Sequence, residues 1–151
     1  MRDEKWDMRF LALAKLVSSW SKDGSTQVGA VICDSDHRII SVGYNGLAVA
    51  LKDEKLNENR DRKLKTIIHA EINAILFAEN KDLKGATLYT WPMMPCSNCS
   101  SVIIQKKIAR CVFPKASPER QARWEESFRV ATEQFTEVGI LLDEYESDLF
   151  L

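Results

Sequence analysis

Apolar residues recur every three or four positions near the start of the chain, at Trp6, Phe10, Leu13, Val17 and Trp20. This spacing is typical of an amphipathic helix whose apolar face packs against a core. Asp3 precedes the stripe and is suited to cap the first turn. The polar stretch 21–25 contains a glycine and ends the predicted helix.

Two apolar stretches separated by a short polar turn predict a β-hairpin. The first strand is expected at 26–33, the turn at 34–36 and the return strand at 38–44. Asn45 and Gly46 end the second strand, and this residue pair is common in turns. Two interpretations of Asn45 remain open here: a turn residue, or a side-chain amide presented to a ligand at the strand end.

The second half of the chain alternates between helical and strand-like stretches. Segment 68–78 is apolar nearly all round, which predicts a helix buried against a sheet. Ser117 and Pro118 suit the cap and the first position of a later helix. The acidic segment 143–148 is expected to fray or to contact a neighbouring subunit. The other expected elements are a strand at 87–91, a helix after Cys96 with Val102, Ile103 and Ile104 in the core, a strand at 109–113, a helix carrying Trp124, Phe128, Ala131 and Phe135, and a strand at 138–142.

This order of elements predicts an α/β fold with three layers, α/β/α, in which helices cover both faces of a mixed five-stranded sheet. The first two strands are joined by a turn and should be antiparallel. The last three are joined by helices and should be parallel. A chain of 151 residues fits one domain, 1–151, with a sizeable core.

Residues 47–65 form the most highly charged stretch. Such a run is usually a solvated loop or an exposed helix. Long loops in compact domains also serve as lids or ligand loops. The basic residues Arg60, Arg62, Lys63 and Lys65 could hold a phosphate, and the pattern does not decide between this role and simple solvation.

Composition narrows the class of protein. The formal net charge is −1, so there is no bulk positive field to attract nucleic acid. No stretch resembles a signal peptide or a membrane span. Four cysteines, two of them in a C-x-x-C pair, fit a reducing compartment and a metal site better than a disulfide framework. A cytoplasmic protein is therefore expected.

One histidine and two cysteines offer metal ligands. His69 is followed two residues later by Glu71, and Cys96 and Cys99 follow Pro95. A structural zinc site is normally closed by four protein ligands, whereas a catalytic one leaves a position for water. Only one other histidine and two other cysteines exist in the chain, so the composition favours an open, catalytic metal over a purely structural zinc module.

Glu71 has a different expected role. Residues two apart do not face each other on a helix surface, but at the first turn of a helix both side chains can reach one pocket. A carboxylate beside a metal-bound water can move its proton. H-x-E followed by P-C-x-x-C is the signature of zinc deaminases, in which the glutamate moves protons and is not a ligand.

The sequence resembles the deoxycytidylate (dCMP) deaminase family of the cytidine deaminase-like zinc enzymes. The matching stretches are 21–31 (Ser-Lys-Asp-Gly-Ser-Thr-Gln-Val-Gly-Ala-Val), 43–46 (Gly-Tyr-Asn-Gly), 69–75 (His-Ala-Glu-Ile-Asn-Ala-Ile), 83–90 (Leu-Lys-Gly-Ala-Thr-Leu-Tyr-Thr) and 95–99 (Pro-Cys-Ser-Asn-Cys). The resemblance implies a cytidine deaminase-like fold and hydrolysis of dCMP to dUMP and ammonia, which supplies dUMP for thymidylate synthesis. One catalytic Zn²⁺ per subunit would be held by His69, Cys96 and Cys99, with Glu71 as the catalytic residue.

The resemblance also implies sites for nucleotides. Substrate contacts are expected from Lys22, Ser25, Thr26, Asn45 and Ala70, with the phosphate near Lys22 and 25–26. An effector site for dCTP as activator or dTTP as inhibitor, with Mg²⁺, would lie near Tyr44 and Gly46. Members of the family are commonly homohexamers.

The chain departs from the family pattern at three places. Gly24 stands where the family often has proline, and Trp91-Pro92-Met93-Met94 replaces a short polar stretch and could reshape the pocket. The segment 47–68 lacks the cysteines and histidines that give some members a second, structural zinc, so one zinc is expected. The expected effector site lies beside this loop, so nucleotide regulation depends on a part of the chain that differs from the family pattern. The sequence leaves open whether dCMP is preferred over CMP or dCTP. It also leaves open two other activities, those of a tRNA adenosine deaminase and of a riboflavin-pathway deaminase.

Overall fold

The computed structural model describes residues 2–52 and 56–150. The helices are α1 (Glu4–Ser18), α2 (Arg60–Thr66), α3 (Ala70–Phe77), α4 (Ser97–Gln105) and α5 (Pro118–Glu137), with a short 3₁₀ helix at Ser147–Phe150. The strands are β1 (Gly29–Cys33), β2 (Ile39–Tyr44), β3 (Thr87–Trp91), β4 (Arg110–Pro114) and β5 (Leu141–Tyr145). No helix in these two ranges is long and apolar enough to cross a membrane.

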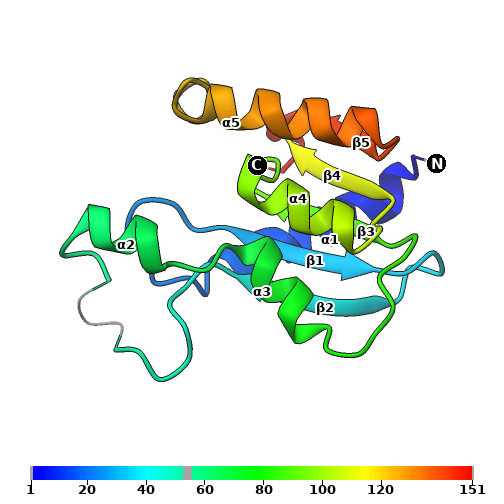
Figure 1. The fold of residues 1–151 in the computed structure, drawn as a ribbon. Helices are drawn as coiled ribbons and strands as arrows, with labels where there is room; N and C mark the ends of the chain where they lie inside the picture. Colours follow the sequence, from blue (N-terminus) through cyan, green and yellow to red (C-terminus); the bar gives the residue numbers. More distant parts are fainter. Residues whose placement is uncertain (1, 53–55, 151) are drawn as a thin grey trace.

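The five strands form one mixed sheet in the order β2-β1-β3-β4-β5. Strand β1 pairs antiparallel with both β2 and β3, while β3, β4 and β5 are parallel to one another. This confirms the predicted antiparallel hairpin and the parallel set of three. Figure 1 shows α3 and α4 in front of the sheet and α1 behind it, so the predicted three layers are confirmed as well.

Each face of the sheet has its own core. Val31 and Cys33 of β1 pack toward α1, in a cluster that also holds Phe10. The alternate residues Ala30 and Ile32 pack toward α3, α4 and α5. This alternation follows from the period of two along a strand. It explains why β1 is apolar at every position and buried throughout.

Two glycines let helices approach the sheet closely. A Cβ atom added at Gly43 would lie 2.4 Å from the backbone nitrogen of Ala74 in α3. One added at Gly29 would lie 2.0 Å from the carbonyl oxygen of Ala14 in α1. Both distances are too short for any side chain. The first contact holds α3, which begins directly after His69, against the hairpin.

The caps of α1 and α5 agree with the sequence prediction. The Asp3 carboxylate accepts a hydrogen bond from the Trp6 amide at 3.5 Å, and the Ser117 hydroxyl accepts one from the Arg120 amide at 3.3 Å. The apolar stripe of α1 is shorter than predicted, because the helix ends at Ser18 and Trp20 is 50% exposed.

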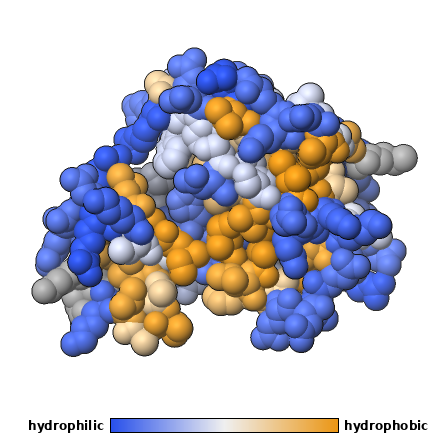
Figure 2. All heavy atoms as spheres, in the orientation of Figure 1, coloured by the Kyte–Doolittle hydropathy of each residue, from blue (hydrophilic) through white to orange (hydrophobic). Residues whose placement is uncertain are grey.

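Three predicted core positions are wrong. Leu76 and Phe77 at the end of α3 are 58% and 62% exposed, and Val102 of α4 is 37% exposed. Figure 2 shows apolar atoms gathered on the surface where α3 lies in Figure 1. The all-apolar pattern predicts a helix buried on every side, whereas the sheet covers only one side of α3.

The last strand lies three residues later than predicted. Helix α5 continues to Glu137, and Gly139 turns the chain with φ of +79°. As a result Asp143 and Tyr145, assigned by the sequence to a frayed acidic segment, form the second half of β5. Strand β1 likewise begins at Gly29, because the Thr26 and Val28 amides bond to side chains and not to a strand.

A buried polar cluster explains why β5 includes acidic residues. The Arg110 guanidinium bonds Asp7 at 2.6 and 2.9 Å and Asp143 at 2.6 Å. The Tyr145 and Tyr89 hydroxyls donate to Asp7 at 2.6 and 3.0 Å. Burial alone would raise the pKa of Asp7, but the bonds from Arg110 and Tyr145 hold that pKa below its usual value.

We expect Asp7→Ala to lower the free energy of unfolding by about 3–5 kcal/mol, because it leaves the buried Arg110 without its main partner. The matched control is Asp36→Ala, which breaks an exposed ion pair with Arg38 and should cost less than about 1 kcal/mol. Urea unfolding at pH 7 measures both. Equal losses in the two variants would contradict a stabilising role for the buried cluster.

Candidate active site

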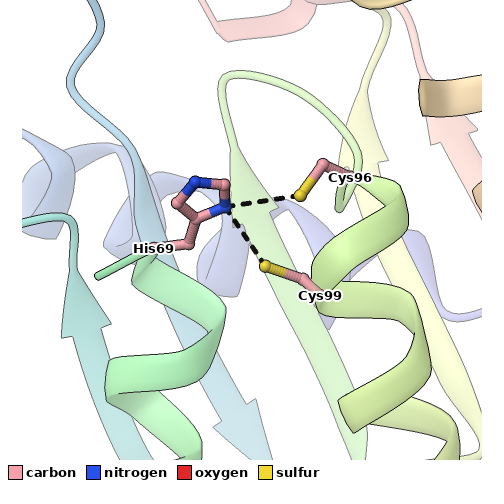
Figure 3. Close-up of side chains that lie close together, drawn as sticks. All are labelled: His69, Cys96 and Cys99. Atoms are coloured by element: carbon pink, nitrogen blue, oxygen red, sulfur yellow. Dashed lines mark hydrogen bonds between the residues drawn. The ribbon is translucent and has the colours of Figure 1, made fainter. Parts of the chain in front are cut away.

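The two helices that follow the sequence motifs bring three metal-ligand side chains together. His69 is the N-cap of α3, Cys96 is the N-cap of α4, and Cys99 lies in the first turn of α4. The Nδ1 atom of His69 is 3.3 Å from the Sγ atoms of both cysteines. Figure 3 shows both thiols pointing at the same edge of the imidazole ring.

This cluster has the composition and size of a zinc site. Its three ligand atoms lie within 4.8 Å of one another. Tetrahedral zinc, with bonds of about 2.3 Å to sulfur and 2.0–2.1 Å to nitrogen, places its nitrogen and sulfur ligands about 3.6 Å apart. Among the described residues, no further histidine, cysteine or carboxylate joins the group. The arrangement fits a metal with a position left for another ligand.

The three ligand side chains shift one another's pKa values. A hydrogen bond from Cys99 lowers the pKa of the Cys96 thiol to about 4, and His69 adds to this effect against burial. The hydrogen bond with Cys96 raises the pKa of His69 to about 9. The same thiolate raises the pKa of Cys99. A metal ion requires thiolates and a neutral imidazole, so its binding would release protons from these groups.

The other two cysteines lie apart from the cluster. Cys33 and Cys111 are buried in the cores on opposite faces of the sheet, and burial raises the pKa of Cys33 to about 12. All four thiols are free. Cys33 and Cys111 are therefore packing residues.

Glu71 lies beside the cluster and outside the group of three ligands. It is in the first turn of α3 and is 4% exposed. Burial raises the pKa of this carboxyl. A buried carboxyl with a raised pKa is suited to accept a proton and to return it.

A cavity that is partly open to solvent adjoins the cluster. His69, Glu71 and Cys96 line it. The remaining lining residues are Asp23, Ser25, Thr26, Val28, Asn45, Arg60, Lys63, Leu64, Ile67, Ala70, Met93, Met94, Arg123 and Trp124.

Four of the five residues expected to contact a substrate lie on this cavity: Ser25, Thr26, Asn45 and Ala70. The fifth, Lys22, is exposed and does not line it. The Lys22 carbonyl oxygen accepts a hydrogen bond from the Asn57 side chain at 3.0 Å.

Asn45 lies directly after β2 and is not part of a tight turn, and its side chain holds a neighbouring loop. Its amide oxygen accepts from the Val28 amide at 2.9 Å, and its amide nitrogen donates to the Thr26 carbonyl at 2.9 Å and to Asp23 at 3.5 Å. These bonds fix the loop 23–28 against the end of β2. The amide oxygen can accept one more bond, so it can still bind a ligand in the cavity.

A buried ion pair holds α2 against the same loop. The Lys63 ammonium lies 2.9 Å from the Asp23 carboxylate and 3.1 Å from the Ser25 hydroxyl. Its charge is therefore balanced within the protein. Of the four basic residues that the sequence offered for binding a phosphate, Arg60 and Lys63 line the cavity. Arg62 lines a second surface pocket, together with Lys63 and residues of 47–52 and 56–59.

Tyr44 and Gly46, the expected effector residues, lie outside the cavity lining. Tyr44 is 39% exposed and makes an edge-on contact with the Trp20 ring at 6.1 Å between centroids. Gly46 exchanges backbone hydrogen bonds with Ile68 at 3.1 and 2.8 Å. This bridge fixes the residue directly before His69.

Several lining residues had no site role in the sequence analysis. Met93 and Met94 lie in the stretch that the sequence analysis described as able to reshape the pocket, and both line the cavity. Trp124 was assigned to the core stripe of α5, and Arg123 was not singled out. The periodicity of α5 places Trp124 on the buried side of the helix. The periodicity does not show that a cavity borders this side.

A family model, that of the cytidine and deoxycytidylate deaminase zinc-binding region, matches residues 4–115. The match contains His69, Glu71, Cys96 and Cys99 and ends before α5.

Named relatives agree with this match. An uncharacterized deaminase of Aliivibrio fischeri is 42% identical over 136 residues, covering 90% of each chain. Human deoxycytidylate deaminase is 37% identical over 115 residues, which are 72% of this chain and 64% of that protein. The deoxycytidylate deaminase of Mycobacterium phage D29 is 33% identical over 129 residues, covering 74% and 96%. The chain thus spans less than two thirds of the human protein.

The fold is similar to that of a solved deaminase. A crystal structure of dCMP deaminase from cyanophage S-TIM5, in complex with dCMP and dUMP, superposes with a TM-score of 0.73 at 19% identity, covering 95% of this chain and 99% of that one. At this level of identity the likeness concerns the fold, and it confirms the cytidine deaminase-like architecture.

Proposed function

We propose that this chain, which belongs to the cytidine and deoxycytidylate deaminase zinc-binding family, removes the amino group of dCMP by hydrolysis, giving dUMP and ammonia. The observation that carries the proposal is the placement of buried Glu71 beside the His69, Cys96 and Cys99 cluster, with Glu71, His69 and Cys96 lining one cavity. The product would serve thymidylate synthesis.

His69, Cys96 and Cys99 would hold one Zn²⁺ ion. When bound, zinc acts as a Lewis acid that lowers the pKa of a coordinated water from 15.7 to about 7. Both ligand-bearing helices begin at the cluster. The partial positive charge of the two helix N-termini would stabilise negative charge that develops at the reacting centre.

Glu71 would carry the protons of the reaction. Its carboxylate accepts the proton of the attacking water and delivers it to the pyrimidine ring nitrogen next to the amino-bearing carbon. It then accepts the proton of the hydroxyl group newly attached to that carbon and passes it to the amine, so that the carbon–nitrogen bond breaks and ammonia leaves. One carboxyl acts first as base and then as acid, which suits a buried group whose neutral form is favoured.

Substrate identity rests on the relatives named as deoxycytidylate deaminases, at 33–37% identity. We assign substrate contacts to Ser25, Thr26, Asn45 and Ala70, which line the cavity. The net charge of −1 disfavours an RNA substrate, which would require a basic face. We place the single-domain enzyme in the cytoplasm, where its free thiols would stay reduced.

We also propose regulation by dCTP and dTTP with Mg²⁺, in a homohexamer, from the family resemblance. A surface pocket lined by Leu47, Leu51, Lys52, Glu58 and Arg62 follows directly after Tyr44 and Gly46 in the chain. It offers cationic side chains that suit a triphosphate.

The direct test is ammonia release, or loss of cytosine absorbance, from the zinc-loaded protein. We expect turnover of dCMP, with lower kcat/KM for CMP, dCTP and an adenosine-containing tRNA stem-loop. Adding dCTP or dTTP with Mg²⁺ tests regulation in the same assay. A zinc-loaded protein that leaves dCMP intact, or deaminates another substrate faster, would contradict the proposal.

A further inference from the structure

Helix α5 packs against α4, the helix that carries two of the metal ligands, with a side that is not wholly apolar. Phe128, Ala131 and Phe135 of α5 are buried, and Ala131 belongs to the same core cluster as the two cysteines. Ser127 and Gln134 lie four residues before and three residues after Ala131, so all three share one side of the helix. Figure 1 shows α5 next to α4. The match to the family model ends before α5 begins, so these polar side chains reach α4 from outside the matched region.

Ser127 binds the backbone directly after the first metal-ligand cysteine. The Ser97 amide donates to the Ser127 hydroxyl at 2.9 Å, and the Ser127 hydroxyl donates to the Ser97 hydroxyl at 3.1 Å. Ser97 is the first residue of α4, so its amide has no acceptor within the helix. Ser127 supplies that acceptor, and the amide it binds belongs to the peptide bond that joins Cys96 to the helix.

Gln134 makes a similar contact directly after the second cysteine. The Ser100 hydroxyl donates to the side-chain oxygen of Gln134, and the side-chain nitrogen of Gln134 donates to the Ser101 hydroxyl at 3.4 Å. Ser100 is fully buried and follows Cys99 in the chain. Each cysteine of the C-x-x-C pair is therefore followed by a serine that α5 binds.

These contacts matter because both cysteines lie at the end of a helix. Cys96 is the N-cap of α4 and Cys99 is in its first turn, and both Sγ atoms are 3.3 Å from Nδ1 of His69. Helix ends have unpaired amides and open more easily than helix interiors. Opening of this turn would move the sulfur atoms away from the imidazole nitrogen. A binding site needs its ligand groups held to within about 0.5 Å by neighbouring contacts.

We propose that Ser127 and Gln134 are positioning residues that hold the first turn of α4 in the geometry required for metal binding. Neither belongs to the group of three ligands, and neither lines the cavity. Both act through the serines that follow the cysteines. This inference rests on the proposed function, because it concerns the zinc ion that the function requires. Contacts that orient metal ligands typically contribute 10–100-fold to metal affinity.

The test measures the dissociation constant for zinc, by competition with a chromophoric chelator, in Ser127→Ala and Gln134→Ala. Ser127→Ala leaves the Ser97 amide without its acceptor, so it should raise the dissociation constant about tenfold or more. Gln134→Ala should raise it by a smaller factor, because the Ser100 hydroxyl also donates to the Ser97 carbonyl oxygen at 2.8 Å. The visible absorption bands of bound Co²⁺ depend on ligand geometry, and they should shift in Ser127→Ala.

Control variants separate positioning from general stability. Phe135→Leu shrinks a fully buried side chain of the same helix, so it should lower Tm but keep the wild-type dissociation constant for zinc. Thr136→Ala removes an exposed hydroxyl from α5 and should change neither quantity. Ser127→Thr keeps a hydroxyl at the contact and should bind zinc as the wild type does. A dissociation constant within threefold of wild type in Ser127→Ala, or an equal rise in Phe135→Leu, would overturn the proposal.

Failure of the proposed function can be told apart from failure of this inference. If the wild-type protein binds zinc but does not deaminate dCMP, the proposed substrate is wrong, and the zinc affinities of the variants still test the role of Ser127. If the wild-type protein deaminates dCMP and Ser127→Ala binds zinc with unchanged affinity, the function stands and the positioning role is rejected.

Discussion

Replacing Glu71 with glutamine is expected to lower kcat for dCMP by about 10³-fold while the protein keeps its zinc. Removal of a general acid–base group costs typically 10²–10⁴-fold. Glutamine has nearly the same shape, but its amide cannot accept and return a proton. Because Glu71 is outside the group of three ligands, metal content should stay at one per chain. Steady-state kinetics and metal analysis of the same preparation measure both quantities.

The stability of the Glu71→Gln variant separates catalysis from folding. Burial disfavours the charged carboxylate at position 71, so a neutral amide should leave the Tm unchanged or raise it. Glu79→Gln is the matched control, because Glu79 is exposed just beyond the end of α3, and it should keep wild-type kinetics. A Glu71→Gln enzyme with kcat within threefold of wild type would rule out Glu71 as the proton carrier.

The sequence predicted the cluster well because each motif acts locally. His69 and Cys96 each directly precede a helix, so the short spacings of H-x-E and C-x-x-C determine which side chains share the first turn. Only one long-range fact was then required, that the two helices begin side by side. The deaminase signature supplied it, and the structure shows α3 and α4 on the same face of the sheet.

Features that depend on distant partners were not accessible to the same reasoning. Lys63 is 40 residues from Asp23, and nothing in the charged stretch distinguishes it from its solvated neighbours. Arg110 joins Asp7 and Asp143 from opposite ends of the chain. These pairings determine which charged residues are buried. Because of them, β5 includes residues that the sequence pattern assigns to an acidic tail.

The surface of α3 shows a second kind of limit. A helix that is apolar on every side predicts burial on every side, but the sheet covers only the face with Ala70 and Ala74. Leu76 and Phe77 remain exposed. Likewise, the pattern of α5 placed Trp124 on its inner face without revealing a cavity there. Hydrophobic periodicity identifies the apolar face of a helix. What packs against that face depends on the whole fold.

Replacing Cys96 with serine is expected to abolish zinc binding, with loss of all measurable dCMP deamination. Two ligands remain, and serine is a poor substitute for a thiolate whose pKa is lowered to about 4. Zinc present at 1,000 times its dissociation constant stabilises the folded protein by about 4 kcal/mol. Unfolding curves with and without a chelator should therefore differ by this amount or more for wild type and coincide for Cys96→Ser.

Cys111→Ala is the matched control for the loss of a buried thiol. Cys111 is fully buried in β4 and is not in the cluster, so this variant should lose some stability through a small cavity but keep one zinc per chain. Its unfolding curve should still respond to the chelator. The chelator response thus reports the metal and not the packing. If Cys96→Ser responds as Cys111→Ala does, the zinc ligands lie elsewhere, and the site assigned to His69, Cys96 and Cys99 is wrong.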